Sequence, residues 1–430
     1  MTAVTPIRTA AEKALGEAIA AHLDGLSAPL ARIAAPAAAQ FATAGLPHRR
    51  IEDYHYTDLR ALLRAVPPAA PRATADAAPI ADCLPADLPR HRLVFVDGRF
   101  DAAASDTAVV AGVEVAALTD ALAAGLTLGG VAPEADPLVG LNSALAGDGV
   151  VIRVAAGATV EALLEIAHVT TGATLAAVRH VVELGAGARL RLIESHAGPD
   201  ATAYQVNAML EMRLADGAHA TLVKLQAEGS TATHFGTLAA TLGAGAELNH
   251  FVLNSGGELI RNQLFVRFDG ENANLATRGA NLLAGRQHAD TTLVVDHAVP
   301  HGQSRELYKS VIDDRAKGVF QGKIIVRPGA QKTDGRMASH SILLSDEAEV
   351  ANKPELEIFA DDVQCGHGAT AGELDEKLKF YLMARGIPRA EAERLLVLAF
   401  LAETVEEMGD AEIGAVLTGR IEAWLSGRRR

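Results

Sequence analysis

The densest group of side chains with possible chemistry lies between residues 361 and 370, in the segment DDVQCGHGAT. Cys365 and His367 are two residues apart, so on an extended strand their side chains point to the same face. A thiolate and an imidazole on one face can bind a soft or borderline transition metal. Two protein ligands cannot complete such a site, so the remaining ligands must come from another molecule. A structural interpretation also stays open, in which Cys365 is a packed thiol and His367 a hydrogen-bonded histidine at a domain junction.

A second polar segment, KTDGRMASHS, starts at Lys332 and contains Asp334 and His340 near a predicted strand. A ladder of surface side chains explains this pattern more simply than a binding site does. We therefore treat Asp334 and His340 as surface residues. His168 and His180 have no partner that their spacing identifies, so we interpret both as structural or exposed.

Several common sites are absent from the sequence. Cys83 and Cys365 are the two cysteines of the chain, which excludes a disulfide framework and a self-contained four-thiolate zinc or iron–sulfur site. The sequence also lacks a phosphate-binding G-x-x-x-x-G-K-[ST] loop, a G-x-S-x-G elbow and an H-E-x-x-H motif. We expect a protein that is not an enzyme, and a nucleotide-using step would belong to another subunit.

Charge and hydropathy narrow the class of protein further. The 53 acidic residues exceed the 39 basic ones, and the formal net charge of −14 argues against a general nucleic-acid binder. The N-terminal segment MTAVTPIRTAAEKALGEAIAAHLDG mixes charges into an alanine-rich helical pattern and lacks the apolar core of a secretory signal. No stretch approaches the ~18 uncharged apolar residues of a membrane-spanning helix. We therefore expect a cytoplasmic protein that does not associate with membranes.

The elements that must position Cys365 and His367 are predicted to be strands of a solenoid. Short β-type runs follow the Gly-Ala pairs that contain Ala188, Ala218 and Ala246, and these alanines recur at a nearly constant spacing. A repeat of this length built from short strands is typical of a solenoid, in which each coil buries its inward face against its neighbours. Leucine and arginine also alternate over residues 189–192, as expected for a strand with one buried face. We predict a mainly β fold with a β-helix core, and a β-sandwich with glycine turns is the alternative.

Helical patterns flank this core. We assign residues 1–90 to an N-terminal helical domain with a Pro/Ala-rich linker, and 91–150 to an α/β lead-in. Residues 151–365 form the predicted β-helix core, and 366–430 a C-terminal helical domain. In the last domain, Val397, Leu398 and Leu401 widen the apolar surface of one helix beyond a single stripe. We expect the helix that ends in Trp424 and Leu425 to cover part of this surface, and another protein to cover the rest.

The C-terminal third contains the motifs QKTD, LLSD, KPELEI, ADDV, HGAT and FYLMARGI between residues 331 and 387. Together with neighbouring positions from about 305 to 390, they resemble the core of the SufB/SufD family of iron–sulfur cluster assembly proteins. The segment GLPHRRIEDYHYTDL, residues 45–59, is similar to an N-terminal signature of the same family. SufB-like proteins carry a cysteine on a late solenoid strand, whereas the comparable residues 337–344 contain none. This difference favours the SufD branch.

The resemblance implies a function and two partners. It implies a scaffold subunit of the SUF complex that forms a heterodimer with SufB through the β-helix and holds the ABC-type ATPase SufC with its terminal helices. It also implies that His367 faces a SufB cysteine and serves as a metal ligand for a transient iron–sulfur cluster at this interface. Cys365 is then a nearby, less certain contributor to cluster binding. The sequence does not decide whether a flavin takes part or whether the chain alone forms a homodimer.

Two other functions remain as alternatives. The chain could be a purely structural adaptor of the same complex, in which His367 shapes the interface without binding metal. A polysaccharide-active β-helix enzyme fits less well, because aromatic residues for sugar stacking make up 4% of the chain.

Overall fold

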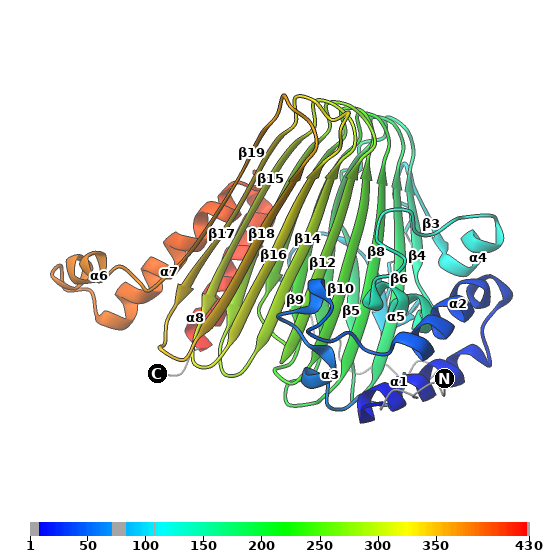
Figure 1. Cartoon of the computed structure of the whole chain (residues 1–430), viewed down its shortest axis with the longest axis horizontal. Helices are drawn as coiled ribbons and strands as arrows, with labels where there is room; N and C mark the ends of the chain where they lie inside the picture. The colour runs from blue at the N-terminus through cyan, green and yellow to red at the C-terminus, as the bar shows by residue number, and fades with distance from the viewer. Residues whose placement is uncertain (1–7, 71–82, 107, 428–430) are drawn as a thin grey trace, which may run out of the picture.

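A computed structural model describes residues 8–70, 83–106 and 108–427 of the chain. The fold is mainly β, and the predicted β-helix is confirmed (Figure 1). Its strands form a ten-stranded sheet, called sheet B here, and a nine-stranded sheet, called sheet A. From β4 onward, successive strands alternate between the two sheets, so each coil contributes one strand to each of them. The interior between the sheets contains the largest apolar cluster of the described residues.

Most solenoid strands are nine or ten residues long and run parallel to their neighbours. Sheet B contains β2 (Arg99–Phe100), β1 (His91–Val96), β5 (Leu164–Val169), β7 (Arg189–Ala197), β9 (His219–Ala227), β11 (Glu247–Asn254), β13 (Asn274–Leu283), β15 (Gln303–Ile312), β17 (Asp334–Leu343) and β19 (Gln364–Gly372). Sheet A contains β3 (Val113–Ala117), β4 (Val150–Val154), β6 (Leu175–Leu184), β8 (Gln205–Leu214), β10 (Thr233–Leu242), β12 (Leu259–Phe268), β14 (His288–His297), β16 (Lys317–Val326) and β18 (Glu349–Ile358). The last strand therefore extends past residue 365, where the sequence suggested that the β-helix ends.

The glycines that marked the repeat lie at the corners of the coils. Gly187, Gly217 and Gly245 each stand two residues before a strand of sheet B and have φ angles of 68°, 65° and 61°. Residues with a side chain rarely adopt this left-handed conformation, so glycine lets the chain turn here without steric cost. The corners also stack, because the amide of Gly187 donates to Asp216 O and that of Gly217 donates to Ala244 O, both at 2.8 Å.

The N-terminal helices and their connections lie on the outer face of sheet A, where the backbone carbonyl of Asp53 accepts from Gln321 on β16 and Glu52 pairs with Lys353 on β18. They are α1 (Ala10–Leu23), α2 (Ala28–Ala44), the short 3₁₀ turn η1 (Glu52–Tyr54), α3 (Leu59–Leu62), α4 (Leu118–Ala123) and α5 (Pro137–Leu145). The segment 45–59 is fixed to β12 by Arg261, whose guanidinium lies 4.1 Å from the centre of the Tyr54 ring and 2.5 Å from Asp290. Part of the predicted Pro/Ala-rich linker, residues 71–82, lies outside the described residues.

The C-terminal helices are α6 (Glu376–Met383), α7 (Arg389–Glu406) and α8 (Ala411–Gly427). Polar contacts attach α7 and the start of α8 to the outer face of sheet B. The Nζ atom of Lys309 donates to Phe400 O at 2.6 Å, and Arg278 pairs with Glu407 at 3.0 Å. The helix α6 lies at the outer end of this group, away from the sheets (Figure 1). No helix in the described parts of the chain is both long and apolar enough to cross a bilayer.

The two ends of the solenoid differ. At the N-terminal end, the sheets finish with the short antiparallel strands β2 and β3. At the C-terminal end they finish with the long parallel strands β18 and β19, which are the last strands of their sheets. The side chains of both strands are exposed or half-buried throughout. Among the described residues, this end of the β-helix therefore lacks a covering element.

Candidate functional site

Cys365 and His367 lie on β19, at the uncovered end of the β-helix. Their register partners on β17 are Gly335 and Met337, respectively. Side chains in register on neighbouring parallel strands point to the same face, and Met337 is 2% exposed within the interior apolar cluster. His367 therefore faces the same way as Met337, but no described strand follows β19, so its imidazole is exposed. Cys365 is half-buried and packs against the interior cluster.

Cys365 and His367 differ in how far they are buried. Burial raises the pKa of the Cys365 thiol, despite a hydrogen bond from the backbone of Gly335. The thiol rather than the thiolate is thus favoured in the isolated chain, and the thiolate is the form that binds metal. On either side of His367, a Cβ atom added to Gly366 or Gly368 would meet no heavy atom within 4 Å. The exposed imidazole is therefore open to approach by a second molecule.

Glu306 continues the column of side chains that ends at His367. It is the register partner of Met337 on β15, so the three residues occupy equivalent positions on β15, β17 and β19. Glu306 is 1% exposed, and this burial raises its pKa to about 8. The carboxyl group is accordingly protonated at neutral pH and adds no negative charge beneath the exposed histidine.

The surface interpretation of Asp334 and His340 agrees with their contacts. Asp334 pairs with Arg305 at 2.6 Å and with Arg336 at 3.2 Å, and all three side chains are partly exposed. His340 is three residues from Met337 on β17 and hence on the opposite face of the strand. Its Nδ1 atom forms a 2.8 Å hydrogen bond with the hydroxyl of Thr370. The structure thus separates His340 from the Cys365–His367 pair.

The expectation that a partner protein covers α7 is wrong for Val397 and Leu401. Both side chains are fully buried and belong to a cluster that includes Ile193, Val223 and Phe251 on the outer face of sheet B. The cover comes from the solenoid and from α8 of the same chain, as expected for the helix that ends in Trp424 and Leu425. Exposed apolar side chains are instead concentrated on α6, where four large residues are more than two-fifths exposed: Leu378, Phe380, Tyr381 and Met383.

The structure also brings together polar residues that the sequence analysis did not assign to a common site. His168 lies beside Glu194 and His196 inside the solenoid, and His196 lies beside Glu228 and His234. Their separation along the chain hides this contact, although the interval between His168 and His196 is close to the spacing of the glycine corners. Applying the repeat length to histidines would have been a usable signal.

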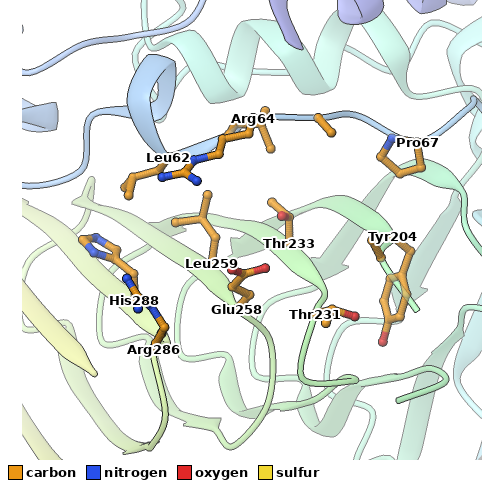
Figure 2. Close-up of a pocket in the computed structure, with 13 residues that line it drawn as sticks. Leu62, Arg64, Pro67, Tyr204, Thr231, Thr233, Glu258, Leu259, Arg286 and His288 are labelled. Atoms are coloured by element: carbon orange, nitrogen blue, oxygen red, sulfur yellow. The ribbon is translucent and has the colours of Figure 1, made fainter. Parts of the chain in front are cut away.

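A cavity of about 440 Å³ lies between the segment after α3 and the first residues of β10, β12 and β14 (Figure 2). Arg64 and Leu62 come from the segment above the sheet, and Glu258, Arg286 and His288 come from the solenoid side. Neither Cys365 nor His367 lines this cavity. It is thus separate from the C-terminal end of the β-helix.

Both halves of the chain match models of known protein families. Residues 17–166 match the SufBD protein N-terminal region, and residues 167–400 match the SufBD core domain of SUF system FeS cluster assembly. The second match begins inside β5 and covers the remaining strands of the solenoid.

Individual relatives agree with the family matches. The iron-sulfur cluster assembly protein SufD of Escherichia coli is 32% identical over 408 residues, which cover 91% of this chain and 92% of the relative. An iron-sulfur cluster assembly SufBD family protein of Synechocystis is 29% identical and covers 89% of this chain and 87% of its own length. SufD of Bacillus subtilis is 32% identical over 36% of each chain. With these matches along nearly its whole length, the chain belongs to the SufB/SufD family of iron–sulfur cluster assembly proteins and is similar to its SufD members.

Proposed function

We propose that this chain is a SufD-type scaffold subunit, without enzymatic activity of its own, in a SUF complex. In this proposal it pairs with SufB through the open end of the β-helix and binds the ATPase SufC through its C-terminal helices. An iron–sulfur cluster is assembled as cargo at the interface with SufB. His367 contributes a ligand to this transient cluster, and Cys365 contributes a second, weaker one.

The exposed position of His367 is the observation that carries the proposal. The imidazole stands on the last strand, facing the same way as the interior side chains but not covered by a further described coil. Imidazole is an accepted ligand of iron–sulfur clusters beside thiolate. With two cysteines in the chain, the remaining ligands must come from a partner. A subunit that docks against β19 would bring its own side chains close to His367.

The unpaired edges of β18 and β19 support pairing through the β-helix. The backbone N–H of Gln364 donates to Thr333 O at 2.8 Å, so the backbone N–H groups of every second residue from Gln364 onward face β17. The amides of residues 365, 367, 369 and 371 then point away from the sheet. A long edge with free backbone groups is a template for strand pairing with a second molecule. SufB, as a related β-helix, would offer the complementary edge.

The helix α6 supports docking of SufC. Phe380 is 72% exposed and Leu378 is 52% exposed, although most large apolar side chains of the chain are buried. A cluster of exposed apolar residues on a projecting helix is typical of a protein–protein contact. The helix α7 links this surface to sheet B, so a partner bound to α6 would be mechanically coupled to the scaffold.

The proposal is tested by co-expressing the chain with SufB and SufC and replacing His367 by alanine. We expect the complex to assemble in normal yield but to hold less cluster after anaerobic reconstitution, measured by iron and sulfide content and by visible absorbance. His340→Ala is the matched control, because it removes an imidazole from the opposite face of the neighbouring strand. Full cluster loading by the His367→Ala complex would contradict a ligand role, and loss of the heterodimer would favour a structural one.

A further inference from the structure

A group of polar side chains lies in the interior of the solenoid near its N-terminal end. Leu190 and Leu192 of β7 belong to the interior apolar cluster, so the alternation of the strand also directs Glu194 and His196 inward. On β5 the same alternation directs His168 inward after Ile166. These polar side chains are deeply buried: His168 is 6% exposed, Glu194 4% and His196 0%.

The three side chains converge on one carboxylate oxygen. His168 and His196 are register partners on neighbouring coils, and their rings are stacked with centres 4.3 Å apart and planes at 7°. The Nε2 atom of His196 lies 2.9 Å from Oε1 of Glu194, and Nε2 of His168 lies 3.9 Å from the same oxygen. One potential ligand atom from each residue lies within 4.8 Å of the other two.

The 2.9 Å distance is that of a hydrogen bond between His196 and Glu194, whereas 3.9 Å leaves Nε2 of His168 beyond hydrogen-bond distance of the same oxygen. An ion bound at about 2.1 Å by tetrahedrally arranged donors requires donor atoms about 3.4 Å apart, which lies between the two observed distances. The Nε2 atom of His168 is buried and has no hydrogen-bond partner among the described residues. A buried nitrogen of this kind is costly unless something binds it. A metal ion bound by the two imidazoles and the carboxylate would satisfy it, once one ring of the stacked pair rotates so that its in-plane lone pair points at the ion.

We propose that His168, Glu194 and His196 bind one divalent first-row transition-metal ion inside the solenoid. Two imidazoles and one carboxylate form a donor set that suits Zn²⁺, Co²⁺ and Fe²⁺, and suits Mg²⁺ and Ca²⁺ poorly. This site is distinct from the cluster site proposed at His367, which lies on the last coil of the solenoid.

The ionisation of the ligands is consistent with this assignment. Burial, together with the neighbouring His196 and His180, holds the pKa of His168 well below its usual range. Burial alone would raise the pKa of Glu194, but Lys224 and His196 outweigh it and hold this pKa well below its usual range. Neutral imidazole and ionised carboxylate are the forms that bind metal.

The ammonium group of Lys224 competes with the proposed metal ion for the carboxylate of Glu194. Its Nζ atom lies 3.6 Å from Oε1 of Glu194, so in the absence of metal the ammonium group balances the buried carboxylate. A cavity of about 20 Å³ borders Glu194, Lys224 and His250, which is enough for one water molecule. Because the ammonium repels a bound cation, Lys224 should weaken binding.

A second group, His196, Glu228 and His234, shares one histidine with the proposed site. In this group, Gln226 donates to Oε2 of Glu228 at 2.9 Å. Nδ1 of His234 lies 2.8 Å from the same oxygen. We place the ion at His168, whose Nε2 atom lies 3.9 Å from Oε1 of Glu194 and thus has room for an ion between them, and use His234 to test this choice.

The test uses the full chain, produced in medium supplemented with Co²⁺, whose visible absorption reports coordination by protein ligands. We expect about one equivalent of Co²⁺ per chain, as for a single three-ligand site, and displacement by Zn²⁺ but not by Mg²⁺. His168→Leu and Glu194→Gln should lose the metal and its absorption, whereas His297→Gln and His367→Ala should keep both. Lys224→Met should bind Co²⁺ several-fold more tightly in a competitive titration.

Each outcome decides the assignment. Absence of bound metal in the folded wild-type chain, or equal binding by the His168→Leu variant, would overturn the site. Loss of metal with His234→Gln but not with His168→Leu would move the ion to the second group and also overturn it. If the variants do not fold, X-ray absorption of the wild-type Co²⁺ form still decides. Two imidazoles and an oxygen donor are expected, and a sulfur ligand would point to Cys83 or Cys365 instead. Retention of metal by His367→Ala keeps this result independent of the proposed cluster site.

Discussion

His367 lies in register with Met337 on the neighbouring strand, so an exposed imidazole ends a column of side chains that begins in the solenoid interior. Cys365 is two residues away on the same face, but it is half-buried and its pKa is raised by burial. The two residues are therefore unequal candidates for cluster binding.

We expect Cys365→Ala to lower the cluster content of the co-expressed complex less than His367→Ala does. The reason is that a protonated, partly packed thiol must lose its proton and move toward the interface before it can bind iron. Iron and sulfide analysis of both variants, prepared in parallel, checks the order. A Cys365→Ala complex with less cluster than His367→Ala would reverse the assigned roles.

A second prediction concerns the edge of β19. Ala369→Pro removes one amide that points away from β17, and with it one hydrogen bond to a docked strand. We expect SufB binding to weaken by about fivefold, which corresponds to a net contribution of about 1 kcal/mol. Ala369→Ser keeps the amide and is the control. Equal affinities of the two variants in a titration with SufB would argue against pairing through this edge.

A third prediction concerns SufC. Phe380→Asp places a charge on the most exposed apolar side chain of α6 and should weaken SufC binding by tenfold or more, about 1.4 kcal/mol, with little effect on stability. Val109→Asp makes the same change at another exposed apolar residue outside α6. Binding is measured with purified SufC. Deletion of residues 388–430 is a poorer test, because it would also expose the outer face of sheet B that α7 covers.

A fourth prediction tests the glycine corners. Gly217 has a φ of +65°, and a β-branched residue tolerates this region poorly, so Gly217→Val should destabilise the chain by more than ~1 kcal/mol. Gly172 has open space around it and no positive φ. Gly172→Val should therefore change the free energy of unfolding by less than ~0.5 kcal/mol. Urea unfolding of both variants provides the comparison, and similar losses would show that the positive φ is not the cause.

A fifth prediction concerns pH. Burial raises the pKa of Glu306 from 4.5 to about 8, so between these values the folded chain holds a proton that the unfolded chain releases. Stability should then fall as pH rises through this window, by up to ~1.4 kcal/mol per pH unit. The buried histidines act in the opposite direction but at lower pH, since burial lowers the pKa of His180 and of His297 to about 4.

Between pH 6.5 and 8, the pH dependence of stability is therefore expected to come from Glu306 rather than from the buried histidines. We expect Glu306→Gln to remove the decline in stability that the wild-type chain shows over this interval. The measurement is the urea midpoint of both proteins at each pH. A wild-type slope that persists in the variant would assign the titration to another group.

The solenoid could be predicted because its turns need a specific residue. Gly187, Gly217 and Gly245 recur at nearly constant spacing, and the alternation at Leu190 and Leu192 indicates which face is buried. The position of Cys365 and His367 on one strand followed from the same period of two. The exposure of His367 could not be predicted in this way, because it depends on β19 being the last strand of its sheet.

The contacts that were missed are those made across coils or between layers. Leu401 belongs to one buried cluster with Val223 and Phe251, which lie far earlier in the chain, on strands in the middle of the solenoid. A usable signal was present, since the adjacent apolar pair Leu222 and Val223 indicates a strand buried on both faces. The contact between His168 and His196 follows from their register on neighbouring strands, and their separation, which is close to the glycine spacing, was a usable signal for it.

The unequal ends of the solenoid limit how large an assembly can grow. One end finishes in short antiparallel strands, and the other presents two long strands to a neighbour. When two such subunits join, each docks through the end that carries β18 and β19, and the described residues offer one such end per chain. Further subunits then find only the short strands, so association should stop at a pair. The short antiparallel strands at the N-terminal end thereby prevent further subunits from adding edge to edge, so the protein does not polymerise into a fibril.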